Sequence, residues 1–350
     1  MRKLLLLTLA IPLGAWFLPP AAGAPEASNS VKLRTRSPVT AIAADGKRVA
    51  LLIPGHGRWR VLIWEPAVHR VLAIHTESDA DPGGSVALAG TRIAWDDWWG
   101  GLTIETRVSS ATIAHPAAVS LGSDEGTDGG PGWEVLAPRG DGKLLAFTVQ
   151  LRCDADGSDP DCPPGRQTGD VVYATIWRAA PGGRCSTSLN DFRRPGHCVR
   201  VAKATGRLTV FAVDAGRIAA RTDDGVRLLT GGGRRLRDFP VRNVSAAALS
   251  GNRLALRVPG AFEIYDTGSG ELAETIPAQG GADRLEDLES GILVTVRGKT
   301  VTLRRLSDGH TARLHASGWA RAQLEPAGLF VAAGRRVTFT PMADVLRRLG

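Results

Sequence analysis

The histidines of this 350-residue chain are scattered, and their spacing predicts no local catalytic or metal-binding set. Only His69 and His75 fall on one predicted strand, six residues apart, where both could face the same side. A serine nucleophile elbow, a zinc-binding H-E-x-x-H motif and a phosphate-binding loop are absent from the sequence. The sequence therefore predicts no catalytic residue, although loops from distant parts of a repeat fold can still assemble an enzymatic site.

The densest group of carboxylates lies between Asp154 and Asp161, around Gly157. Alternating aspartates beside a glycine turn, here Asp154, Asp156 and Asp159, supply the oxygen ligands that calcium prefers. The stretch lacks the full twelve-residue calcium loop and its terminal glutamate. We therefore interpret it as a solvated acidic loop, keep calcium as the alternative, and otherwise expect no cofactor.

Aromatic residues next to aspartates offer a different chemistry, that of a binding surface. Trp98 and Trp99 directly follow Asp96 and Asp97, and Trp133 ends a connection rich in glycine and aspartate. Tryptophan contributes more binding energy than most side chains when it is presented at an interface. We name these five residues the tryptophan sector. They are either a partner-binding surface or packing at the outer edge of the fold, and the sequence leaves both interpretations open.

The elements that must position these residues come from a repeat of about 40 residues. Seven times a small turn residue, usually glycine, introduces a short apolar strand, as in D-G-K-R-V-A-L-L from Asp45. The anchoring glycines are Gly46, Gly90, Gly142, Gly216, Gly251, Gly291 and Gly328. In the fifth unit four alternating strands are predicted, at 244–250, 252–259, 261–266 and 271–277. Four strands per unit at this period are typical of the blades of a β-propeller.

The third strands of two units end in an aromatic–acid pair, Ile63-Trp64-Glu65 and Ile264-Tyr265-Asp266. The second pair continues into the turn D-T-G-S-G-E at 266–271. With these motifs the chain resembles the WD40-like propellers and, more loosely, the exported bacterial TolB-like propellers. The resemblance covers nearly the whole chain after the first 24 residues and implies an all-β fold of seven four-stranded antiparallel blades. The family's Gly-His pair is missing from most repeats, and the resemblance implies no particular partner.

The seventh unit lacks a convincing fourth strand, whereas Val31 to Arg36 form a spare strand ahead of the first unit. Pairing this spare strand with the strand around Val337–Thr340 would close the ring and remove two open sheet edges. We therefore expect residues 25–350 to form one closed propeller, with the N-terminal strand in the last blade.

Residues 1–24 are predicted to be a signal peptide and not part of the fold. Arg2 and Lys3 precede an apolar run from Leu4 to Leu18, and small residues follow as far as Ala24. The run of about 15 residues is shorter than the roughly 20 needed to span a bilayer. We therefore expect cleavage, a secreted, periplasmic or cell-envelope location, and no transmembrane segment afterwards. An uncleaved anchor is the alternative.

The formal net charge of +8 comes from arginines spread through every repeat, with small clusters only at 234–237 and 347–348. A basic chain can bind nucleic acid. In an exported protein we interpret the charge as a matter of composition and exposed strands, and we expect no nucleic-acid partner. The oligomeric state is not predicted.

All four cysteines lie in the third unit, and an exported protein with four cysteines is expected to form disulfides. Cys153 and Cys162 flank the connection between the second and third strands, and Cys185 and Cys198 flank the next connection, at the opposite end of the blade. The intervening strand at 171–177 spans roughly 20 Å, whereas a disulfide tolerates at most about 7 Å between Cα atoms. We therefore predict the pairs Cys153–Cys162 and Cys185–Cys198.

Three unusual segments are expected to meet on one face of the disc. In a propeller, loops between second and third strands emerge on the same face as the connections between blades. The tryptophan pair, the connection 122–132 and the insert 153–170 belong to these two kinds of loop. We therefore expect a non-enzymatic module that binds a protein or an envelope component through this face. Two alternatives stay open: a hydrolase or lactonase with a loop-assembled metal site at the central channel, and a purely structural or assembly module.

Overall fold

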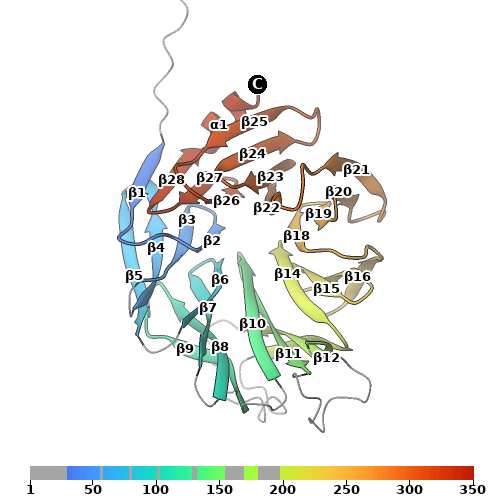
Figure 1. The fold of residues 1–350 in the computed structure, drawn as a ribbon. Helices are drawn as coiled ribbons and strands as arrows, with labels where there is room; N and C mark the ends of the chain where they lie inside the picture. The colour runs from blue at the N-terminus through green and yellow to red at the C-terminus, as the bar shows by residue number, and fades with distance from the viewer. Residues whose placement is uncertain are drawn as a thin grey trace, which may run out of the picture.

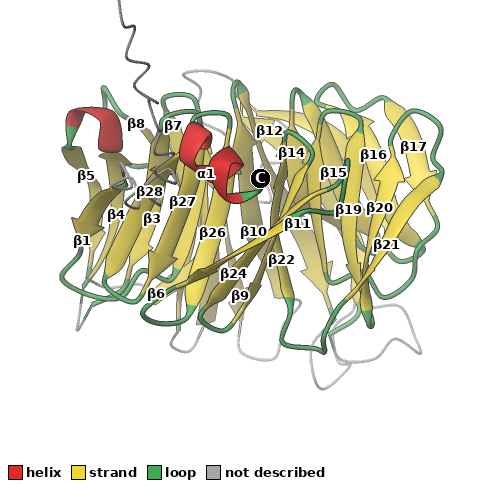
Figure 2. Ribbon diagram, turned by 90° about the horizontal axis from the view of Figure 1, so that it is seen from above, coloured by secondary structure: helices red, strands yellow, loops and turns green. Residues whose placement is uncertain are grey.

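Seven four-stranded antiparallel sheets form a ring in the computed structural model, which describes residues 30–55, 58–78, 81–100, 103–127, 132–153, 169–179 and 198–350. Figure 1 looks along the axis of this ring, and the first strand of each blade lies nearest the centre. Figure 2 shows the disc from the side, with the strands crossing its thickness. The predicted all-β propeller of seven blades is confirmed.

The first three blades contain the longest strands. Blade 1 comprises β2 (Ala41–Asp45), β3 (Arg48–Ile53), β4 (Trp59–Glu65) and β5 (Arg70–Glu77), with the 3-10 turn η1 (Pro66–Val68) between β4 and β5. Blade 2 comprises β6 (Asp81–Ala89), β7 (Arg92–Trp99), β8 (Thr103–Thr112) and β9 (Val119–Thr127). Blade 3 comprises β10 (Gly132–Asp141), β11 (Leu144–Arg152), β12 (Val171–Ala179) and β13 (Cys198–Thr205).

The remaining blades are shorter and more regular. Blade 4 comprises β14 (Leu208–Asp214), β15 (Arg217–Thr222), β16 (Gly225–Thr230) and β17 (Arg235–Phe239). Blade 5 comprises β18 (Ala246–Ser250), β19 (Arg253–Val258), β20 (Ala261–Asp266) and β21 (Leu272–Pro277). Blade 6 comprises β22 (Arg284–Glu289), β23 (Ile292–Arg297), β24 (Thr300–Arg305) and β25 (Thr311–His315). Blade 7 comprises β26 (Ala320–Glu325), β27 (Gly328–Ala333), β28 (Arg336–Pro341) and β1 (Val31–Arg34).

The N-terminal strand closes the ring as predicted. β1 pairs antiparallel with β28, and Val31 faces Phe339 while Leu33 faces Val337. The ring of Trp64 in blade 1 packs edge-on against Phe330 in blade 7, with ring centres 6.4 Å apart. The two ends of the chain therefore share one blade, and an apolar core continues from that blade into the next.

The two faces of the disc carry different loops. We call the face with the turns between first and second strands the turn face, and the opposite face, with the second-to-third loops and the connections between blades, the connection face. On the turn face, Gly90 has a φ of +62°, and a Cβ built on it would lie 2.9 Å from the carbonyl oxygen of Gly142. Glycine is needed there because both the backbone angle and the close approach of the neighbouring turn exclude a side chain.

The expected connection at 122–132 is shorter than predicted. β9 continues to Thr127 and β10 begins at Gly132, so most of the segment is strand. The prediction was wrong because the long β8 offers backbone partners to polar residues, as in the pairing of Glu105 with Glu125. Hydrogen bonding along a neighbouring strand here outweighs the low strand propensity of glycine and aspartate.

The chain ends in a short helix, α1 (Met342–Arg348), which the strand pattern did not predict. Val345 and Leu349 are buried in the core shared by blades 6 and 7. Within the described ranges, no helix is long and apolar enough to span a bilayer.

Candidate functional site

The residues of the tryptophan sector on β7 point to two sides of blade 2, because successive side chains of a strand alternate. On one side, Asp96 accepts the Ser85 backbone N–H at 2.7 Å. Burial raises the pKa of Asp96, and the Ser85 N–H and the charge of Arg139 in blade 3 offset part of that rise. Asp96 is therefore held between blades 2 and 3 by Ser85 and Arg139.

Asp97 lies on the opposite side of β7 and is only 1% exposed. Arg107 of β8 donates two hydrogen bonds to its carboxylate, at 2.8 Å and 3.0 Å. Burial raises the pKa of Asp97, and the paired guanidinium opposes the rise. The same guanidinium lies 3.9 Å from the ring centre of Trp99. Asp97, Arg107 and Trp99 thus form a stack that holds the outer ends of β7 and β8 together.

Trp98 is the most accessible residue of the sector whose side chain the structure describes, at 38% exposure. The backbone of Trp133 pairs with Leu151 in blade 3, which brings its strand to the same face, but its side chain lies outside the described part. The calcium candidates Asp154, Asp156 and Asp159 also lie outside the described residues. The role of the sector in binding stays a prediction.

The two histidines predicted on one strand are separated by the turn that precedes β5. His69 caps η1 with a left-handed φ of +50°, whereas the half-buried ring of His75 lies between Trp59 and Trp95. Burial lowers the pKa of His75, and the nearby Glu77 carboxylate opposes this in part. His75 stacks on Trp95 with ring centres 4.9 Å apart, so it serves as a core residue between blades 1 and 2.

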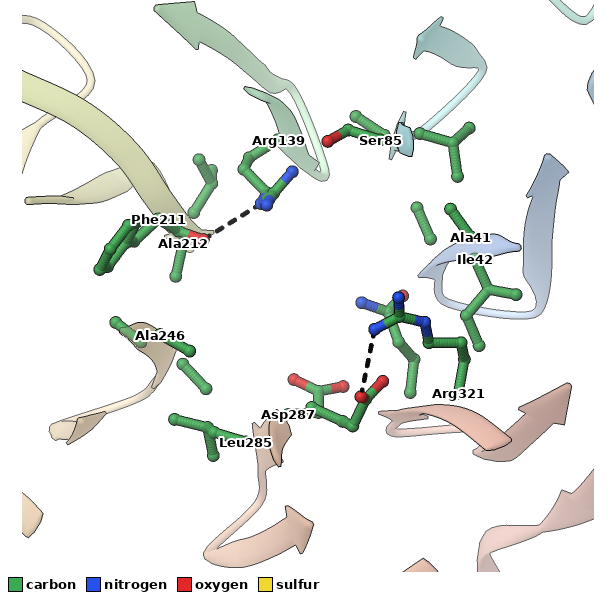
Figure 3. Close-up of a pocket in the computed structure, with 18 of the residues that line it drawn as sticks. Ala41, Ile42, Ser85, Arg139, Phe211, Ala212, Ala246, Leu285, Asp287 and Arg321 are labelled. Atoms are coloured by element: carbon green, nitrogen blue, oxygen red, sulfur yellow. Dashed lines mark hydrogen bonds and ion pairs between the residues drawn. The ribbon is translucent and has the colours of Figure 1, made fainter. Parts of the chain in front are cut away.

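The central channel is a narrow cavity of about 320 Å³ lined mainly by small side chains of the innermost strands. Alanines supply much of the wall, including Ala43, Ala87, Ala212 and Ala248. Figure 3 shows Arg139 and Asp287 projecting into this space from opposite sides. Arg139 donates to the Phe211 carbonyl at 3.1 Å, and Arg321 forms an ion pair with Glu286 at 3.5 Å. Both arginines in the channel are thus engaged with the wall.

Carboxylates gather where the channel opens on the turn face. Five innermost strands end in an acidic residue at the same position, immediately before the turn: Asp45, Asp141, Asp214, Glu289 and Glu325. Sequence analysis missed this ring, although the recurrence of an acid before the anchoring turn was visible in the repeats. The recurring acid does not by itself predict a ring, because the period of the repeat places the strands but does not show that their last residues meet.

These carboxylates join one blade to the next. Asp45 accepts the backbone N–H groups of Gly90 and of Gly142, the latter at 2.9 Å. Glu325 accepts the N–H of Gly46 at 2.9 Å, which links blade 7 to blade 1. Asp141 does the same for Ala215 at 2.7 Å. Three of the five carboxylates therefore link blades through side-chain-to-backbone hydrogen bonds, and the bond of Glu325 crosses the ring closure.

Two carboxylates of the channel have pKa values near neutrality. Burial raises the pKa of Asp287 to about 7, although the N–H groups of Leu324 and Leu288 stabilise its charge. Burial also raises the pKa of Glu325 to about 8, and the charges of Asp287 and Asp45 add to the effect. Burial disfavours the charged form of these two carboxylates, and the like charges nearby add to that effect.

In the described part of the chain, no group of three or more His, Cys, Asp or Glu side chains is arranged to hold a metal ion. Cys153 and Cys198 are both buried, at 3% exposure, and neither is a free thiol. They lie at opposite ends of β12, since the Cys153 N–H donates to the Asp170 carbonyl and Cys198 pairs with Ala179. A nine-residue strand is roughly 26 Å long, so these two cysteines cannot bond to each other. The two predicted pairs stay a prediction, because Cys162 and Cys185 lie outside the described residues.

Solved propellers share this architecture. A chain in the crystal structure of a mitotic checkpoint complex matches 97% of this chain and 98% of its own length, with a TM-score of 0.56 and 13% identity. Sqt1 from Saccharomyces cerevisiae matches 90% of this chain and 99% of its own, with a TM-score of 0.48 and 11% identity. BamB from Moraxella catarrhalis matches 87% and 85%, with a TM-score of 0.45 and 12% identity. No protein-family model and no curated protein sequence matches the chain.

The seven sheets define this protein as a β-propeller, and the matched chain of the checkpoint complex is similar to it in fold. At 13% identity the likeness concerns the fold alone, so residue roles must come from this chain's own side chains.

Proposed function

We propose that this chain is an exported, non-enzymatic propeller that binds a protein or an envelope component through its connection face. Trp98 carries the proposal: a large aromatic side chain is 38% exposed at the end of β7 on that face. Exposed aromatic residues on a rigid support supply binding energy at low entropic cost. The stack of Asp97, Arg107 and Trp99 provides that support directly beside it.

The use of the channel carboxylates favours a binding role over catalysis at the channel mouth. Three of these carboxylates accept hydrogen bonds from backbone N–H groups of other blades: Asp45, Asp141 and Glu325. A general acid or base must reach its substrate within hydrogen-bonding distance. Side chains that tie adjacent blades together are restricted in doing so, which supports a structural use of the ring.

The test replaces Trp98 and compares it with a second exposed tryptophan on the same face. Trp98→Ala is expected to leave the melting temperature within about 2 °C, because Trp98 is not one of the buried core residues. Trp319→Ala is the matched control, since Trp319 is 71% exposed in the connection between blades 6 and 7 on the same face. Immobilised wild type, W98A and W319A are each incubated with envelope extract of the producing organism, and the retained components are identified by mass spectrometry.

A component retained by the wild type and by W319A but lost from W98A supports the proposal. Equal retention by all three proteins contradicts a role for Trp98, and a large loss of melting temperature in W98A would show that the residue is packing. Trp99→Ala is expected to lose stability, because Trp99 stacks on the half-buried Arg107 guanidinium that pairs with Asp97.

A second candidate function is a hydrolase that works at the channel mouth. The observation in its favour is that Asp287 and Glu325 have pKa values of about 7 and 8, which suit general acid or base catalysis at neutral pH. It is tested by assaying ester and lactone hydrolysis between pH 6 and 9 for the wild type and for Asp287→Asn. Activity that the substitution abolishes would support this candidate, and no activity above buffer would remove it.

A further inference from the structure

The positive charge of the molecule is concentrated in two neighbouring blades. Residues 30–77 and 320–350, which form blades 1 and 7, contain thirteen Lys and Arg but only five Asp and Glu. Their net charge of +8 equals that of the whole chain, so the rest of the sequence is neutral in sum. Arginines occur in every repeat, but outside blades 1 and 7 acidic residues balance them in sum, with residues 206–243 of blade 4 also carrying eight Arg against four Asp.

A groove lies at this closure, between β1 with the loop that follows it and the outer part of blade 1. We call it the seam groove, and its volume is about 470 Å³. Its apolar lining consists of Leu33, Ile53, Leu62 and Val71. Its basic lining consists of Arg34, Arg36, Arg58 and Arg60, and no acidic residue contributes.

The acidic residues of the two blades leave these arginines unneutralised. Glu65 binds Arg48 and Arg70, on the opposite side of blade 1 from the groove lining. Asp45 and Glu325 accept backbone hydrogen bonds at the channel mouth. Glu77 pairs with Arg107, and Asp344 pairs with Arg347. Among the described residues, no ion pair involves any of the four groove arginines.

The seam groove also runs beside an open strand edge. β1 is the outermost strand of blade 7, and its inner edge pairs with β28. The Thr35 N–H donates to the Arg335 carbonyl at 2.8 Å, which continues this pairing. Because hydrogen-bonded pairs alternate along an antiparallel ladder, the backbone groups of Lys32 and Arg34 point outward. An extended chain can add to such an edge.

We propose that the seam groove binds an extended acidic segment of a protein partner, laid along β1. Guanidinium groups match carboxylates in planar, two-pronged pairs, and the segment's carboxylates would meet Arg34, Arg58 and Arg60 in this way. Its alternating apolar side chains would cover Leu33 and Leu62. A flat anionic membrane fits less well, since the apolar lining is recessed, as Ile53 at 6% exposure shows. The seam groove does not include Trp98, so its test is independent of the test of the connection face.

The probe is a fluorescein-labelled, end-capped peptide of seven residues in which glutamate and leucine alternate, with a glutamine–leucine peptide as the neutral counterpart. Fluorescence anisotropy is measured at low salt and at about 0.2 M salt, where surface attraction is screened. The test variant is R58E/R60E, and R58Q/R60Q removes the same charges without reversing them. The matched control is R242E/R313E, which changes net charge equally at two exposed arginines on other blades.

We expect micromolar binding of the acidic peptide, at least a tenfold loss in R58E/R60E, an intermediate loss in R58Q/R60Q and less than a threefold change in R242E/R313E. Unchanged binding in W98A would separate this site from the tryptophan sector. Equal weakening by the control pair, equal binding of the glutamine peptide, or no peptide binding by a folded wild type would each overturn the proposal. Binding only to phosphatidylglycerol vesicles, with dependence on Arg58 and Arg60, would overturn it in favour of a membrane surface. Circular dichroism melting confirms that each variant is folded.

Discussion

Replacing Asp287 by Asn should remove a pH-dependent loss in the free energy of unfolding that arises at the channel mouth. The side chain sits at the junction of blades 6 and 7, where its Oδ2 accepts the Leu324 N–H at 2.7 Å and its Oδ1 accepts the Leu288 N–H at 2.8 Å. Its surroundings raise its pKa from 3.8 to about 7. Asparagine keeps one acceptor oxygen and nearly the same volume but cannot ionise, so the substitution isolates the cost of the charge.

The sign follows from proton binding in the two states. Between pH 3.8 and about 7 the native state binds more protons at Asp287 than the unfolded state does, so the free energy of unfolding falls as pH rises through this window. The displacement of the pKa corresponds to about 4 kcal/mol at most. Channel water screens part of this, and we expect Asp287 to cost the wild type about 2 kcal/mol between pH 5 and pH 8.

Urea unfolding followed by circular dichroism at pH 5, 6, 7 and 8 measures the effect. At pH 5 D287N should be about 1 kcal/mol less stable than the wild type, because one N–H loses its acceptor. At pH 8 the order should reverse, with D287N about 1 kcal/mol more stable. Asp224→Asn, the same substitution in an exposed turn, is the control. A D287N-minus-wild-type difference that stays constant from pH 5 to pH 8 would refute the reasoning.

Three further predictions concern stability and covalent structure. Arg107→Met should lower the free energy of unfolding by about 3 kcal/mol in urea titrations, because it leaves the buried Asp97 carboxylate unpaired; a loss below 1 kcal/mol would mean that water replaces the guanidinium. Leu33→Asp should lower the melting temperature by several degrees, since it places a charge where β1 closes the ring, and an unchanged melting curve would show that closure is not needed for stability. Peptide mapping without reduction should recover the pairs Cys153–Cys162 and Cys185–Cys198, whereas a 153–185 or 162–198 link would overturn both the pairing and the order of loops on which it rests.

The blades and their number were predictable because their signals are local. A positive-φ glycine such as Gly251, flanked by alternating apolar residues, specifies a turn and two strands without reference to the rest of the chain. The four strands of blade 5 were placed to within two residues for the same reason. Closure by the N-terminal strand was also predictable, since an incomplete last unit and a spare first strand leave only one pairing that removes both open edges.

The side-chain positions in the tryptophan sector could not be predicted from local sequence alone. Four consecutive residues were treated as one surface because they adjoin in sequence, but β7 extends through Trp99 and its alternation separates them. Asp97 is buried because Arg107, ten residues away on β8, lies opposite it in register. Because the strand is longer than the pattern indicated, Asp97 lies in a buried ion pair and not at the surface beside Trp98.

By itself the sequence determined the all-β class, the seven units and the closing strand, since each depends on periodicity within about 40 residues. Only the tertiary structure decided which side chains meet across blades. Asp45 bonds to Gly142, 97 residues away, and the five terminal acids converge because ring closure brings equivalent positions of different repeats to one axis. The seam groove arises in the same way, from β1 and blade 1 meeting at the closure. Such contacts follow from the geometry of the closed ring, which no local pattern encodes.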